Sequence, residues 1–137
     1  MKGVVLDASV ALAWCFDDED EAPLLLLDAA DRLRFHVPSI WLYEVANGLA
    51  VAERRRRIKP AESSHFLALL EALDLAIEPV TAGSSRGLLD LARTHSLSAY
   101  DAAYLDVAQR LGMPLATVDE TLARAAGEAG VANGLHG

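Results

Sequence analysis

The chain has 137 residues, of which 53% are hydrophobic and 23% are charged, with 9 glycines and 5 prolines. This composition excludes a disordered or low-complexity chain, and one domain typically takes about 100–200 residues. The single cysteine, Cys15, excludes an internal disulfide framework and fits a reducing compartment. No apolar run approaches the ~18–20 residues of a membrane span. We therefore expect one cytoplasmic domain over residues 1–137 that does not act at a membrane.

The charge balance is acidic, with 20 Asp and Glu against 12 Lys and Arg and a formal net charge of −8. Taken alone, this argues against a nucleic-acid-binding surface, which is usually basic. The basic residues are unevenly distributed, however, because five of the twelve fall within 54–59. The run at 17–21 is entirely acidic and is interpreted as a solvated loop. The sequence is therefore compatible with a local basic surface on an acidic protein.

Short apolar runs and longer helical patterns alternate along the first half of the chain. In order, the pattern predicts a strand at 4–6, helices at 9–16 and 22–33, a strand at 35–38, and helices at 39–57 and 60–73. Ser39 is a candidate N-cap, and Pro60 suits the first turn of a helix.

The second half continues the alternation. In order, it predicts a strand at 76–80, helices at 84–95 and 98–112, a strand at 113–118, a helix at 120–129, and a candidate edge strand at 130–132. Strands alternating with helices predict an α/β domain with a central parallel sheet of four or five strands and helices on both faces. Ligands bind such sheets beyond the carboxyl ends of the strands, so the residues just after each strand are the candidates for function.

Four acidic residues occupy strand ends and helix starts. Asp7 follows the first strand, Glu44 lies in the first turns of the next long helix, Asp101 opens the helix at 98–112, and Asp119 follows the fourth strand. Four carboxylates in one cleft would repel one another unless a cation lay among them. Mg²⁺ takes oxygen ligands, and such a site suits phosphoryl chemistry.

Each acid also has a purely structural interpretation. Asp7 and Asp119 could cap the helices that follow them, and Asp101 stands three residues after Ser98, as in a capping box. Glu44 could lie on the solvated face of its helix. The functional interpretation therefore depends on the four acids together.

Four segments resemble, in order, the acidic motifs of PIN-domain nucleases, especially toxins of the VapC type. They are VLDAS at 5–9, VPSIWLYEVAN at 37–47, LSAYDAAYL at 97–105 and LATVD at 115–119. The resemblance implies a single PIN-like domain and a metal-dependent endoribonuclease, the toxin of a type II toxin–antitoxin pair. Two other functions stay open: a non-catalytic PIN-like module that binds protein or RNA, and an RNA-processing nuclease outside a toxin system.

The resemblance also assigns residues and partners. The acids implied to be catalytic and to bind Mg²⁺, with Mn²⁺ as a substitute, are Asp7, Glu44, Asp101 and Asp119. The residues implied to support them are Ser9, Asn47 and Thr117. Whether Glu120 assists or replaces Asp119 is open. The implied partners are an RNA substrate, a cognate antitoxin and a second copy of the chain, with no direct DNA binding.

The basic run has two interpretations. It consists of Arg54, Arg55, Arg56, Arg57 and Lys59. These residues could contact the RNA backbone, or they could form a solvated helix end whose cations suit the helix dipole.

Overall fold

The computed structural model describes residues 2–16, 20–79 and 84–135. Its centre is a four-stranded parallel sheet in the order β3-β2-β1-β4. The strands are β1 (Lys2–Leu6), β2 (Leu33–Pro38), β3 (Leu75–Glu78) and β4 (Leu115–Ala116). The predicted parallel α/β sheet is confirmed.

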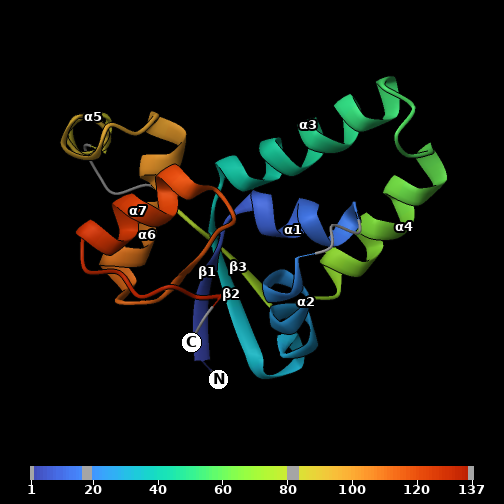
Figure 1. Ribbon diagram of the computed structural model, residues 1–137, viewed down its shortest axis with the longest axis horizontal. Coiled ribbons are helices and arrows are strands. Elements are labelled where there is room, and N and C mark those ends of the chain that lie inside the picture. Colours follow the sequence, from blue (N-terminus) through green and yellow to red (C-terminus); the bar gives the residue numbers. More distant parts are fainter. Residues whose placement is uncertain (1, 17–19, 80–83, 136–137) are drawn as a thin grey trace.

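Helices cover both faces of the sheet (Figure 1). One side carries α1 (Ala8–Cys15), α2 (Glu21–Asp28), α3 (Ile40–Arg54) and α4 (Pro60–Glu71), and the other carries α5 (Ser84–His95), α6 (Ala99–Leu111) and α7 (Glu120–Glu128). A short 3₁₀ helix, η1 (Ala30–Arg32), precedes β2. No helix in the described ranges has the length and hydropathy that a membrane span requires.

The strands are short and apolar because both faces of the sheet are buried. Val5, Phe35 and Val37 are fully buried, and Leu105 of α6 is fully buried beside them. On the other side, α1 and α3 pack closely at Gly48, where an added Cβ would lie 2.7 Å from Leu12 Cδ1. The small residue at position 48 therefore lets the two helices that follow β1 and β2 run side by side.

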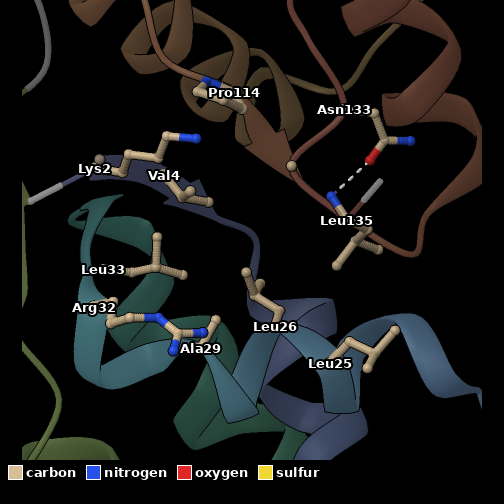
Figure 2. Close-up of a pocket in the computed structure, with 12 residues that line it drawn as sticks. Lys2, Val4, Leu25, Leu26, Ala29, Arg32, Leu33, Pro114, Asn133 and Leu135 are labelled. Carbon is tan, nitrogen blue, oxygen red and sulfur yellow. Dashed lines mark hydrogen bonds between the residues drawn. The ribbon is translucent and has the colours of Figure 1, made fainter. Parts of the chain in front are cut away.

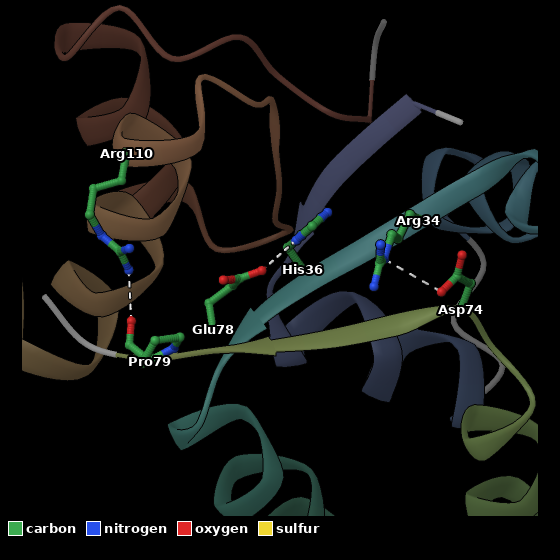
Figure 3. A network of polar contacts seen from close by, with 6 residues as sticks. All are labelled: Arg34, His36, Asp74, Glu78, Pro79 and Arg110. Atoms are coloured by element: carbon green, nitrogen blue, oxygen red, sulfur yellow. Dashed lines mark hydrogen bonds and ion pairs between the residues drawn. The ribbon is translucent and has the colours of Figure 1, made fainter.

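Polar contacts attach the edge strand β3 to its neighbours (Figure 3). His36 Nδ1 lies 2.7 Å from Glu78 Oε1, and Arg34 lies 3.6 Å from Asp74. Arg110 of α6 donates a hydrogen bond of 2.8 Å to the carbonyl oxygen of Pro79. These contacts link β2, β3 and α6 at the face where α6 covers the sheet.

The predicted helix at 22–33 is wrong at its C-terminal end. Helix α2 ends at Asp28, and Leu33 begins β2 instead of closing the helix. Leu33 is buried and pairs with Lys2 of β1. Burial within the sheet thus outweighs the helical pattern of the leucine-rich segment.

The predicted helix at 39–57 is three residues too long. Arg56 adopts a left-handed backbone with φ of 57°, and the Arg57 N–H donates to the Ala52 carbonyl at 2.8 Å, which closes the last turn. Ser39 occupies the N-cap position, but its hydroxyl makes no capping hydrogen bond, because its own backbone is already helical.

The candidate fifth strand at 130–132 is not formed. The chain turns at Gly130, with φ of 77°, and Asn133 makes a single parallel bridge with Leu115. Strand β4 covers two residues and not the six predicted. Val80 of the predicted third strand and residues 17–19 of the acidic run lie outside the described residues.

Candidate acidic active site

The site begins where the carboxyl ends of β1 and β4 lie side by side. Leu6 pairs with Ala116, and the Asp7 N–H continues the ladder with a hydrogen bond of 3.0 Å to the Ala116 carbonyl. Strand β2 lies on one side of β1 and β4 on the other, so the chain passes from β1 to β2 and β3 and then crosses back to the opposite side of β1. This is the point in a doubly wound sheet where a ligand crevice forms.

The Asp7 carboxylate is held by two hydroxyl groups. Ser9 Oγ donates to Asp7 Oδ2 at 2.6 Å, and Thr117 Oγ1 donates to the same oxygen at 2.7 Å. Asp7 stands at the N-cap of α1, but its side chain makes no capping hydrogen bond. Its side chain is 5% exposed. The Asp7 side chain is therefore held toward β4. Its position is not explained by a role as the cap of α1.

The same two hydroxyls hold the segment after β4. The Val118 N–H donates to Ser9 Oγ at 3.2 Å, and the Asp119 N–H donates to Thr117 Oγ1 at 3.0 Å. Ser9 and Thr117 thus connect the start of α1 with the start of α7.

Asp119 caps α7, as its structural interpretation suggested. Its Oδ1 accepts hydrogen bonds from the N–H groups of Thr121 at 2.8 Å and Leu122 at 3.2 Å. The cap leaves Oδ2 free of hydrogen bonds within the described chain. The charge of Asp119 also raises the pKa of Asp7 and of Asp101. The neighbouring Glu120 is exposed. Asp119, and not Glu120, is thus coupled electrostatically to the other acids.

Glu44 enters the cluster through a buried tyrosine. Tyr104 of α6 donates from Oη to Glu44 Oε1 at 2.5 Å and accepts a hydrogen bond of 3.3 Å from the Ala8 N–H. Tyr104 is fully buried. The sequence motifs did not reveal its bond to Glu44. Its position three residues after Asp101, on the same face of the helix, was the available signal.

Asp101 lies in the first turn of α6. Ser98 caps this helix, accepting a hydrogen bond of 3.1 Å from the Asp101 N–H. Only this half of the capping box is formed, and the Asp101 carboxylate accepts no hydrogen bond from the described residues. Burial, followed by the charges of Asp119 and Asp7, raises its pKa to about 6.

Mutual repulsion affects the other two acids as well. Burial raises the pKa of Asp7, and the hydrogen bonds from Ser9 and Thr117 oppose that effect. Burial also raises the pKa of Glu44, and the charges of Asp7 and Asp101 raise it further. The four acids are therefore one electrostatic cluster that disfavours its own negative charge.

The donor set fits a hydrated divalent cation. Glu44 Oε2, Asp119 Oδ2 and both Asp101 oxygens accept no hydrogen bond from the described residues, and Asp7 Oδ1 accepts none from a described side chain. All of these atoms are oxygens that can bind a cation. Within 2–16, 20–79 and 84–135, no three Asp, Glu, His or Cys side chains form a group that could hold a metal ion by themselves. Mg²⁺ typically uses one or two carboxylates and keeps several waters, so a closed cage is not required.

The raised pKa of Asp101 predicts a pH-dependent effect on stability. Its folded pKa of about 6 lies above the ordinary value of 3.8, so the folded state binds the proton more tightly and loses stability as the pH rises between these values. We expect metal-free Asp101→Asn to be more stable than wild type at pH 7 and no more stable at or below pH 4. Thermal unfolding in EDTA across this range measures the difference. An equal difference at every pH would contradict the expected repulsion.

The remaining candidates lie apart from the acids. Asn47 follows Glu44 by one turn of α3, but its side chain is exposed and makes no hydrogen bond to the described residues. Arg54 stands ten residues after Glu44, roughly 15 Å along the helix. Arg57 packs over the Phe16 ring, 4.2 Å from its centroid. The basic run is therefore separated from the cluster by the length of α3.

A pocket of about 720 Å³ lies at the opposite end of the strands from the acidic cluster (Figure 2). Its lining includes Lys2, Leu25, Arg32 and Leu33, at the amino ends of β1 and β2. None of the four acids lines it. The acidic cluster is thus distinct from this pocket.

Residues 4–128 match the family model described as "PIN domain", a segment that contains all four acids. The chain belongs to the PIN domain family. The resemblance seen in the sequence motifs is confirmed.

Relatives and solved structures of this family agree with the match. The chain is 34% identical over 116 residues to Ribonuclease VapC9 of Mycobacterium tuberculosis, covering 85% of each chain. The structure of PAE2754 from Pyrobaculum aerophilum has a TM-score of 0.69 at 24% identity, covering 90% of this chain and 86% of that one. A toxin–antitoxin complex from Klebsiella pneumoniae has a TM-score of 0.57 at 18% identity, covering 85% and 86%. Both structures show the same fold.

Proposed function

We propose that this PIN domain is a metal-dependent endoribonuclease, the toxin of a type II toxin–antitoxin pair, which hydrolyses RNA phosphodiester bonds. The observation that carries the proposal is the buried Asp7, fixed by Ser9 and Thr117 at the strand crossover and coupled to three further acids. The relative named Ribonuclease VapC9 supports RNA as the substrate. We also propose that the protein acts in the cytoplasm, where cellular RNA is found.

The proposed cofactor is Mg²⁺, with Mn²⁺ as a substitute. Asp7, Glu44, Asp101 and Asp119 would hold the cation, with some of them acting through its waters. When bound, the cation would activate water for attack on phosphorus and offset the charge that develops on the phosphate. We expect products with 5′-phosphate and 3′-hydroxyl ends.

The side chains around the acids would keep this site in one geometry. Ser9 and Thr117 both donate from their hydroxyls to Asp7 Oδ2, so no side-chain donor competes with a cation for Asp7 Oδ1. Tyr104 donates to one oxygen of Glu44 and leaves the other. Partners that orient ligands in this way raise metal affinity, because the ligands need not be ordered when the metal binds.

The proposed protein partners are a cognate antitoxin and a second copy of the chain. The Klebsiella pneumoniae structure of the same fold is a toxin–antitoxin complex, which supports an antitoxin for this chain. The homodimer is a proposal from family membership.

The ribonuclease proposal is tested with the purified chain and labelled total cellular RNA. We expect cleavage in Mg²⁺ or Mn²⁺, none in EDTA, and new fragments that a 5′-phosphate-dependent exonuclease degrades. Equal cleavage in EDTA would overturn the metal-dependent chemistry. Binding of RNA or of another protein without cleavage in either metal would favour the non-catalytic alternative.

A further inference from the structure

One face of α3 leads from the acidic cluster to the basic run. Tyr43, Asn47 and Arg54 follow at intervals of four and seven residues, which places them in one stripe along the helix. The residues that α3 buries in the core lie on the opposite face: Trp41, Val45, Leu49 and Ala52. In Figure 1, α3 runs from beside the start of α1 to the outer corner of the molecule, where the chain turns into α4.

The ring at the inner end of this stripe has no structural partner. Tyr43 is 71% exposed, and its side chain makes no hydrogen bond or ring contact with the described residues. It directly precedes Glu44, whose carboxylate belongs to the acidic cluster. An exposed aromatic face beside a nuclease site is available to stack on a base.

The outer end of the stripe carries a local positive charge. Arg54, Arg55, Arg56 and Lys59 are exposed, and none forms an ion pair within the described part of the chain. They lie on a protein whose net charge is −8, so the charge of this turn is opposite in sign to that of the whole chain. Clustered cations of this kind bind phosphates through counterion release.

We propose that the α3 stripe, defined as Tyr43, Asn47 and Arg54, binds single-stranded RNA and guides it to the acidic cluster. A base stacks on Tyr43, the amide of Asn47 contacts the strand, and Arg54 with the adjoining turn binds phosphates. A duplex hides the faces of its bases, so the stripe selects unpaired RNA. Tyr43 and Arg54 are roughly 16 Å apart along the helix, a distance that a short single strand spans. The proposal rests on the proposed ribonuclease function and assigns the residues that would bind its substrate.

The test measures RNA binding apart from cleavage. A fluorescein-labelled 12-nucleotide single-stranded RNA of mixed sequence is titrated with the whole chain at low salt in EDTA, and anisotropy is recorded. We expect Tyr43→Ala to weaken binding about tenfold, the effect of losing one base–aromatic stack. Tyr43→Phe keeps the ring and should bind like wild type. Leu42→Ala removes an exposed apolar side chain from another side of α3 and should also leave affinity unchanged.

A charge variant tests the outer end of the stripe. Arg54→Ala should weaken binding and lower the slope of log affinity against log salt by about one. Arg93→Ala, an exposed arginine of α5, is the matched control and should change neither.

Three results would overturn the stripe. Wild-type RNA affinity in Tyr43→Ala would contradict the proposed stacking contact. Equally tight binding of a 12-base-pair duplex would contradict the proposed preference for single strands. A change in the molar mass of Tyr43→Ala by light scattering, with unchanged RNA affinity, would make this face an interface between copies. If the chain cleaves no RNA but the Tyr43 effect on binding persists, the ribonuclease proposal fails and the stripe stands.

Discussion

Asp7→Asn is expected to abolish RNA cleavage, by at least about 10³-fold, the scale of loss for a residue that catalysis cannot do without. The Asp7 carboxylate is buried, and its Oδ2 accepts both hydroxyl hydrogen bonds of the site. Asparagine has the same size and keeps an oxygen for Ser9 and Thr117, but it removes the charge that would attract a cation. Cleavage of labelled RNA in Mn²⁺ measures the loss.

The fold should survive this substitution. Burial raises the pKa of Asp7, so its charged form destabilises the folded state, and the neutral amide removes that cost. Thermal unfolding in EDTA at pH 7 should therefore show Asp7→Asn at least as stable as wild type. Asp28→Asn, which changes an exposed acid of α2, is the control and should cleave normally. Wild-type cleavage by Asp7→Asn would refute the proposed role of Asp7.

Tyr104→Phe is expected to weaken both the site and the fold. The lost hydroxyl donates to Glu44 and accepts from the Ala8 N–H, and both groups are left without these partners. Burial, the hydrogen bond to Glu44 and the nearby acids raise the pKa of Tyr104, so the phenol stays protonated and remains a donor. Substitution of a residue that orients a metal ligand typically costs about 10–100-fold in metal affinity or activity. An unsatisfied buried polar group costs about 1–3 kcal/mol of stability.

Three measurements distinguish whether the Tyr104 hydroxyl positions Glu44 or only stabilises the fold. Cleavage is followed over a range of Mn²⁺ concentrations, Mn²⁺ binding by calorimetry, and stability by urea denaturation. Tyr100→Phe removes the hydroxyl of an exposed tyrosine on the same helix, α6, and should match wild type in all three. If Tyr104→Phe lost stability but kept both the Mn²⁺ affinity and the cleavage rate, the phenol would support the core and not Glu44.

The sequence predicted the elements whose limits are set locally. Helix α5 has the predicted bounds of 84–95, and α6 is capped by Ser98 and ends at Gly112, as expected. The wrong predictions lie where contacts between residues far apart in the sequence determine the structure. Leu33 leaves its helical pattern because β1 pairs with it, and the fifth strand is reduced to one bridge at Asn133.

The candidate site shows the same division. The order of the acids was visible in the motifs, since each follows a strand or opens a helix. The hydrogen-bond partners of Asp7 could not be predicted from the motifs. Thr117 is 110 residues away and reaches Asp7 only because β1 pairs with β4. The bond between Tyr104 and Glu44 likewise joins two helices that packing alone brings together.

The most direct test of the acidic cluster as a metal site is a calorimetric titration of the purified chain with Mn²⁺, beside Asp7→Asn and Asp101→Asn. It requires no knowledge of the RNA sequence that is cleaved. We predict saturable binding in the wild type that is clearly weaker in both variants. Binding of equal affinity in all three proteins, or no binding at millimolar Mn²⁺, would contradict the assignment of these carboxylates as the metal ligands.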